Sequence, residues 1–237
     1  MRSLGSRSKT SRKHHNHQQV RIRQNAFTLV EIMFVVTIVG FISIGLTTFM
    51  TDSARSMLWS MNKSKITSDV RLFTIRLSKE TLGANTAYVY NSFSSSDSNE
   101  YNDRRNSGQS GDCLVLVYTE PYPDIDSPNH YERIIAYYRE PDSDGISPVY
   151  RSEVKFPTPL EITTNDGLDH FEKFLASKLR ADPANTKTVL ELSKGLSDGR
   201  LFRAAINGTF VVNGEIIHGE NSHEMTNTYN LTVSPRG

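Results

Sequence analysis

An unbroken apolar run lies near the start of the chain. From Ile32 to Thr51 there are twenty consecutive uncharged residues, most of them Ile, Val, Phe, Met or Leu. As an α-helix this run is about 30 Å long, the thickness of the hydrocarbon core of a bilayer. It is longer than the apolar part of a secretory signal, and Asp52 and Arg55 follow it where such a signal has a small-residue cleavage site. The pattern predicts a transmembrane helix segment over residues 27–51.

The helical pattern continues beyond the apolar run. Apolar residues recur at helical spacing on one stripe, with charged residues between them: Ile66, Val70, Phe73 and Leu77. Gly83 is a helix stop signal. One helix is therefore predicted from Phe27 to Leu82, and residues 52–83 are its amphipathic continuation, which packs on a folded domain.

The remainder of the chain, residues 84–237, has the pattern of strands separated by turns. Three runs are rich in β-branched and aromatic residues, namely Cys113–Thr119, Glu132–Tyr138 and Val149–Val154. Residues 91–111 are rich in Ser, Asn and Asp and predict a long exposed loop. Leu168, Phe171, Leu175 and Leu179 recur at helical spacing and predict one further helix.

The last part of the chain carries a hairpin signal. Asn213 and Gly214 lie between two short β-branched runs, and Asn-Gly tolerates the positive φ angles of a two-residue hairpin turn. Residues 229–234 offer a final strand. Together these patterns predict an α+β domain on which the second half of the long N-terminal helix packs.

Charge is distributed unevenly along the chain. Residues 1–26 contain seven basic residues and no acid. Of the 27 Lys and Arg residues, 20 lie after residue 26, against 26 Asp and Glu, so residues 27–237 carry a formal net charge of −6. The basic leader predicts that residues 1–26 stay in the cytoplasm and that the C-terminal domain lies outside. The acidic remainder argues against nucleic acid as a partner.

Candidate chemistry is sparse in this sequence. The single cysteine, Cys113, opens an apolar strand and is expected to be buried rather than reactive, and it excludes an intramolecular disulfide. The acidic segment that begins at Asp142 lacks the later ligand of a calcium loop, and the histidines show no zinc spacing. No phosphate loop or serine nucleophile elbow is present. We therefore expect no catalytic residues, no metal, no cofactor and no enzyme activity.

A recognisable junction precedes the apolar run. The chain reads Gln24-Asn25-Ala26-Phe27-Thr28-Leu29-Val30-Glu31-Ile32. This junction resembles the cleavage and methylation motif of type IV prepilins and type II secretion pseudopilins, in which a small residue precedes Phe-Thr-Leu, an aliphatic residue and Glu. The family usually has Gly where this chain has Ala26, and Ala is the commonest accepted replacement because the peptidase needs a small side chain there. The resemblance implies cleavage between Ala26 and Phe27 and methylation of the new amine.

Glu31 is the one acid in the apolar stretch. An ionised carboxylate inside a membrane helix costs roughly 2.5–3.5 kcal/mol, so it calls for a cationic partner. After cleavage the α-amine of Phe27 lies about one helical turn away. The resemblance gives Glu31 an assembly role, in which it pairs with the Phe27 amine of a neighbouring subunit. The alternative is local, because an acid in the first turn is also favoured by the helix dipole.

The resemblance implies a pilin-like α+β fold, in which the long N-terminal helix packs on an antiparallel β-sheet outside the cytoplasm. It also implies a structural assembly subunit that is processed by prepilin peptidase. Two mid-chain phrases, Arg133–Tyr138 and Pro148–Arg151, resemble the strand pair of the larger minor subunits, the J-type pseudopilins and W-type minor pilins. The expected partners are the peptidase, other pilin or pseudopilin subunits and the inner membrane, with assembly into a periplasmic pseudopilus or a surface pilus. The alternative is a single-pass anchored binding or sensor domain, which needs neither the cleavage site nor Glu31.

Overall fold

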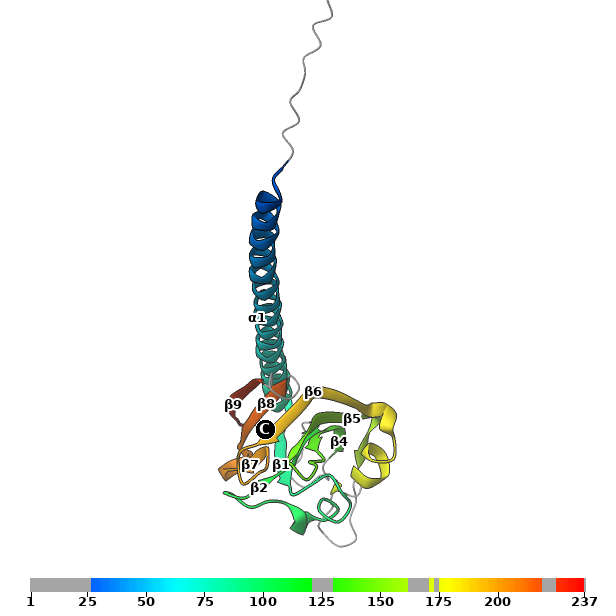
Figure 1. Cartoon of the computed structure of the whole chain (residues 1–237). Coiled ribbons are helices and arrows are strands. Elements are labelled where there is room, and N and C mark those ends of the chain that lie inside the picture. Colours follow the sequence, from blue (N-terminus) through cyan, green and yellow to red (C-terminus); the bar gives the residue numbers. More distant parts are fainter. Residues whose placement is uncertain (1–26, 121–129, 162–170, 173–174, 219–224, 237) are drawn as a thin grey trace, which may run out of the picture. The chain divides into compact units, whose positions relative to one another are not determined.

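The chain divides into two compact units, Met1–Ser53 and Ala54–Gly237, which are described separately below. The computed structural model describes residues 27–120, 130–161, 171–172, 175–218 and 225–236. Figure 1 shows the helix α1 first, in blue to cyan, and the strands after it. The basic leader, with Ala26, lies outside the described residues, as do Leu168 and the start of the helix predicted there.

Helix α1 extends from Leu29 to Gly83, which confirms the predicted single helix to within two residues at its start and one at its end. It contains a stretch with a mean hydropathy of 2.5 and no buried residues, so it is long and apolar enough to cross a membrane. Four threonine hydroxyls within the apolar run donate to the carbonyl four residues earlier, at 2.8–3.0 Å. These bonds satisfy the hydroxyls where water is absent.

The described strands form one antiparallel sheet in the second unit. They are β1 (Thr86–Tyr90), β2 (Ser110–Gly111), β3 (Cys113–Thr119), β4 (His130–Arg139), β5 (Ile146–Glu161), β6 (Thr186–Gly195), β7 (Phe202–Ala204), β8 (Phe210–His218) and β9 (Met225–Val233). Their order is β1-β3-β4-β5-β6-β8-β7-β2, with β9 paired to β8. The four predicted strand runs outside the hairpin lie in strands β3, β4, β5 and β9, except that β9 ends one residue before Ser234. The α+β prediction with an antiparallel sheet is therefore confirmed.

The sheet is covered on both faces, and this explains why the residues of β3 are apolar throughout. Leu114, Leu116 and Tyr118 pack in one core cluster with Phe73 and Leu77 of α1. The alternating residues of β3, Cys113, Val115 and Val117, pack in a second cluster with Phe171, Leu175 and Leu179. Successive strand side chains point to opposite faces, so a strand buried on both faces has no polar alternation. Of the helix stripe predicted at Ile66, Val70, Phe73 and Leu77, Val70 is partly buried against the core and the other three residues are buried.

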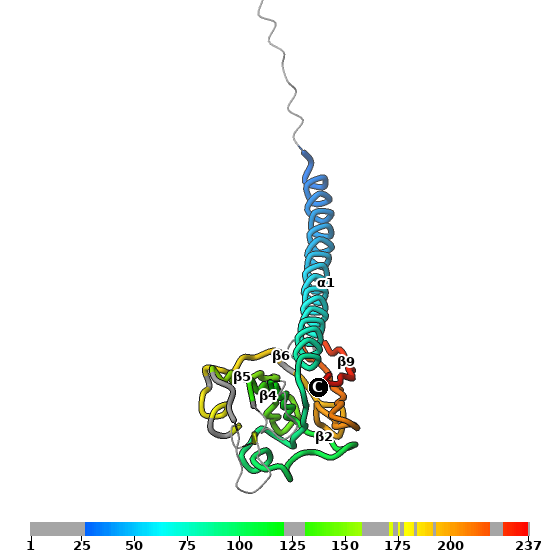
Figure 2. The backbone as a smooth tube through the Cα atoms, turned by 180° about the vertical axis from the view of Figure 1, so that it is seen from behind, coloured from blue at the N-terminus to red at the C-terminus, as the bar shows by residue number. Residues whose placement is uncertain are grey.

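Within the second unit, strands of the one sheet lie on either side of the α1 segment. Strands β4 and β5 lie to one side of that segment and β9 to the other in both views (Figure 1, Figure 2). Polar contacts join the helix to both parts of the sheet. Glu80 meets Arg151 of β5 at 2.9 Å, and Asp69 meets His218 of β8 at 3.1 Å.

The predicted hairpin turn at Asn213-Gly214 is wrong. Strand β8 continues through both residues, and Gly214 pairs with Tyr229 of β9. A Cβ atom on Gly214 would lie 2.6 Å from Cδ1 of Leu201 and 2.7 Å from the hydroxyl oxygen of Tyr229. The glycine is therefore needed for close packing of these side chains on the strand, not for a turn.

The predicted exposed loop over residues 91–111 is only partly a loop. It contains the short 3-10 helix η1 (Tyr101–Asp103) and β2, and both Phe93 and Ser98 are buried. Arg180 follows the π-helical turn η2 (Leu175–Leu179), and its guanidinium donates to backbone oxygens of residues 93–98. This anchoring orders a segment whose composition alone indicates solvent exposure.

Candidate assembly site at the start of the helix

The first residues of α1 form a reciprocal cap. Thr28 precedes the first helical residue, Leu29, and its backbone N–H donates to Oε2 of Glu31 at 2.8 Å. The Thr28 hydroxyl donates to the same oxygen at 3.0 Å, and the backbone N–H of Glu31 faces the Thr28 Oγ1 at 3.3 Å. This is a capping box, in which a Thr and a Glu three residues later satisfy each other's free backbone donors. The sequence Thr-Leu-Val-Glu explains why the helix begins here.

The cap leaves part of the Glu31 carboxylate available. Both hydrogen bonds from Thr28 go to Oε2, and Oε1 has no partner among the described residues. The Glu31 side chain is exposed. Its apolar neighbours Phe27, Leu29 and Val30 are also exposed, by 61–77%. The carboxylate can therefore cap its own helix and accept a cation from outside at the same time.

The structure brings together the motif residues that it describes. Phe27, Thr28 and Glu31 lie within the first turn of the helix, and the apolar residues that follow are exposed as far as Met50. A large exposed apolar surface of this kind marks a contact with lipid or with other proteins. The cap gives Glu31 a local role, as does the helix-dipole alternative from the sequence, and its assembly role stays a prediction.

Two further polar clusters belong to the fold of the second unit. Asp112 and Arg139 are both fully buried and meet at 2.9 Å, and Arg200 reaches the other oxygen of Asp112 at 2.7 Å. Arg139 also donates to the carbonyls of Ser193 at 3.0 Å and Gly199 at 3.1 Å. These residues are not among the candidates predicted from the sequence, although a charged residue directly beside a buried strand was an available signal.

The second cluster is centred on Glu80 in the last turn of α1. Its carboxylate accepts three hydrogen bonds from Arg151 and one from the Tyr137 hydroxyl, and its carbonyl accepts one from Tyr118 at 2.6 Å. Burial raises the pKa of Tyr118 to about 12. Burial opposes ionisation of Glu153, but hydrogen bonding to Arg151 holds the pKa of that carboxyl below its ordinary value. The cluster fixes the end of the helix on β3, β4 and β5.

Sites for other chemistry are few in the part of the chain that the structure describes. Cys113 is fully buried, and this burial raises the pKa of its thiol well above the ordinary value. No group of three or more His, Cys, Asp and Glu side chains in the described residues is placed to hold a metal ion. At the candidate calcium loop, Asp142 accepts hydrogen bonds from the backbone N–H groups of Asp144 and Ile146, both at 3.0 Å. That carboxylate closes a turn.

Residues 21–47 match the family model of the prokaryotic N-terminal methylation motif. No curated protein and no solved structure matches the chain. The match covers the basic end of the leader, the capped helix start and most of the apolar run, and the long helix with its antiparallel sheet is consistent with a pilin-like fold. This motif, at the start of a long apolar helix, supports a type IV pilin-like or pseudopilin-like precursor.

Proposed function

We propose that the chain is a structural assembly subunit, a minor pseudopilin or minor pilin. Prepilin peptidase cleaves it between Ala26 and Phe27, and the mature subunit enters a type II secretion pseudopilus or a type IV pilus. The observation that supports this most is the helix start, where one carboxylate oxygen of Glu31 has no partner among the described residues and the apolar helix around it is exposed. Assembly is a non-enzymatic role, in which the chain supplies packing surface and register.

The proposed docking contact is an ion pair. Cleavage creates an α-amine on Phe27, which carries a positive charge below its pKa of about 8. In a bundle of such helices, the amine of one subunit meets the Glu31 carboxylate of its neighbour while the apolar faces pack. The pair fixes the axial stagger of the two helices, because apolar packing alone is tolerant of sliding.

The place of action follows from the same features. The chain is a single-pass protein of the inner membrane before assembly, with the leader in the cytoplasm and residues 52–237 outside. Its partners are the prepilin peptidase and other pilin or pseudopilin subunits. The alternative, an anchored binding or sensor domain, uses the same helix only as an anchor.

Three variants of the capping box separate pairing from capping. Glu31→Gln removes the charge but keeps the cap, because Gln also serves at this position of a capping box. Glu31→Leu removes both, and Thr28→Ala keeps the charge while removing the threonine side of the cap. We expect both Glu31 variants to be lost from filaments and Thr28→Ala to be retained. Burying one member of an ion pair without the other costs about 3–5 kcal/mol, enough to return the subunit to the membrane pool.

The measurement is the fraction of each variant in sheared or crosslinked filament complexes, at equal membrane abundance and equal leader cleavage. If Glu31→Gln assembles like the natural chain while Glu31→Leu does not, the carboxylate acts only as a cap. Equal recovery of all three variants, with the leader cleaved, would favour the anchored-domain alternative.

A further inference from the structure

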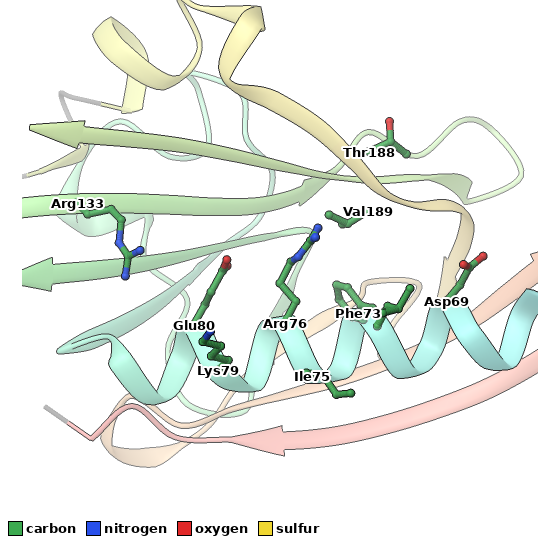
Figure 3. Close-up of a pocket in the computed structure, with 10 residues that line it drawn as sticks. Asp69, Phe73, Ile75, Arg76, Lys79, Glu80, Arg133, Thr188 and Val189 are labelled. Atoms are coloured by element: carbon green, nitrogen blue, oxygen red, sulfur yellow. The ribbon is translucent and has the colours of Figure 1, made fainter.

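A groove lies between α1 and β6 within the second unit (Figure 3). Its volume is about 540 Å³, and its lining includes Leu72, Phe73, Ile75, Arg76, Thr188 and Val189. Leu72 and Ile75 are 64% and 54% exposed, so the helix side of the groove offers apolar surface to a ligand. Figure 3 shows Arg76 rising from the helix towards the strand that carries Thr188 and Val189.

The strand beside the groove has an open edge. Strand β6 pairs with β5 from Thr186 onwards, but it pairs with β8 only at Ser193–Gly195. In the described part of the chain, no strand therefore pairs with residues 186–191 on the side away from β5. Such an edge presents unpaired N–H and C=O groups to another chain. A bulge in the β5–β6 pairing falls at Val189, which also lines the groove.

The charge around the groove is positive, although residues 27–237 carry a net charge of −6. Arg76 and Lys79 are exposed and have no ionic or hydrogen-bonding partner among the described residues. The two acids of the lining are engaged elsewhere, since Glu80 is held by Arg151 and Asp69 faces His218. Lys187, on the open edge itself, adds a further exposed cation, and the acid at the end of that edge, Glu191, is paired with Lys65 at 2.7 Å.

We propose that this groove binds an extended acidic segment of a partner protein, which adds to the free edge of β6 as an extra strand. Backbone hydrogen bonds to residues 186–191 supply sequence-independent affinity, as in other cases of strand addition. Acidic side chains of the segment meet Arg76 and Lys79, and its apolar side chains cover Leu72 and Ile75. The proposal does not depend on filament assembly, because an anchored monomer has the same groove.

The open edge is selective rather than generally adhesive. A lysine on an edge strand and a bulge both disfavour pairing with unrelated strands. Lys187 repels a basic strand, and the extra residue at Val189 interrupts the regular ladder. A segment of opposite charge overcomes the repulsion, so the predicted partner is acidic and not merely apolar.

Short synthetic peptides test the proposal on the full chain in detergent micelles. The first probe alternates Glu and Val, and the second has Lys in place of every Glu. The third has the Glu-Val sequence with N-methyl groups on the amides of one edge, which removes the backbone donors and keeps the charge. We expect only the first probe to bind well, and to slow amide hydrogen exchange at residues 187–191. Equal binding of the second or the third probe would overturn the proposal, as would no binding of the first.

Charge variants locate the site. Replacing Arg76 and Lys79 together by Gln is expected to weaken binding of the Glu-Val peptide about tenfold, since two exposed ion pairs of ordinary strength amount to roughly that factor. Arg71→Gln is the matched control, because Arg71 is exposed on the same helix and does not line the groove. Equal loss from the control and the double variant would show non-specific attraction and refute the site.

Discussion

Gly214 lies in the middle of β8, where the side chains of Leu201 and Tyr229 pack over its α-carbon. The Tyr229 ring is part of the main core, yet its hydroxyl is buried without a hydrogen-bond partner in the described structure. A buried hydroxyl without a partner costs about 1–3 kcal/mol relative to a satisfied one. This position therefore combines close packing with an unfavourable polar atom, and the two effects can be separated by mutation.

We predict that Tyr229→Phe stabilises the domain by up to about 1–2 kcal/mol, because it removes the buried hydroxyl and keeps the ring.

Gly214→Ala should destabilise the domain by about 1–3 kcal/mol through overpacking, and less so on the Tyr229→Phe background. Thermal unfolding of the detergent-solubilised chain, followed by near-ultraviolet circular dichroism, measures both changes. Gly83→Ala is the control, since the nearest atom to its new Cβ lies 3.5 Å away. Additive effects of the two substitutions would contradict the proposed clash with the hydroxyl.

The residues that the sequence revealed are those whose signal is local. Thr28 and Glu31 are three positions apart, and their capping contact depends only on that spacing. Asn213-Gly214 misled the prediction because a dipeptide does not show that Tyr229 of β9 and Leu201, just before β7, pack over it. The buried pair of Asp112 and Arg139 was missed for the same reason, since 27 positions separate the two residues.

At the scale of elements, α1 meets different surroundings along its length. Its first part carries exposed apolar residues, its middle buries the stripe that begins at Ile66, and Glu80 in its last turn binds three strands. Periodicity identified the first two parts because they consist of a long run and a clear stripe. Strand β6 was not predicted, since its bulge at Val189 breaks the alternation with period two.

The buried cluster around Asp112 joins several elements that are far apart in sequence. Asp112 lies between β2 and β3, Arg139 ends β4, and Arg200 lies before β7. Asp112 Oδ1 also accepts the backbone N–H of Leu201 at 3.1 Å. The cluster stabilises the meeting point of these elements because every contact to Asp112 is a charge-assisted or backbone hydrogen bond.

We predict that Asp112→Asn destabilises the domain by about 3–5 kcal/mol, because the Arg139 guanidinium is then left buried without an opposite charge. Urea unfolding of the solubilised chain gives the free energy directly. Asp142→Asn is the matched control, since that carboxylate is exposed and an amide oxygen can accept the same backbone hydrogen bonds. A change below 1 kcal/mol in Asp112→Asn would mean that the cluster contributes little to stability.

At the scale of the whole molecule, burial is confined to one of the two units. In the described chain, the first buried residue is Ile66, and none of the core lies in the unit that ends at Ser53. Under the proposed function, the exposed apolar surface of that unit contacts lipid before assembly and other subunits after it. The proposed removal of the leader also changes the charge balance, because all seven of its charged residues are basic.

The last prediction concerns that removal. We expect the mature chain to begin at Phe27 with a methylated α-amine, because a small residue precedes the capped helix at the cytoplasmic edge of the apolar run. Intact mass of the membrane-bound protein decides this. Ala26→Gly should be processed like the natural chain, and Ala26→Leu should retain the leader, since the peptidase needs a small side chain at that position.

The uncut variant links processing to docking. Without cleavage Phe27 has an amide nitrogen in place of a charged amine, so it cannot form an ion pair with the Glu31 carboxylate of a neighbouring subunit. Ala26→Leu should therefore reach the membrane in normal amount, because the basic leader and the apolar run are unchanged, and yet be absent from filaments. A natural chain that keeps its leader, or one cut near Ala54, would contradict the assignment of the junction. Assembly of the uncut variant would instead show that the amine is not part of the docking contact. The packing of the apolar helix faces alone would then set the axial stagger between subunits.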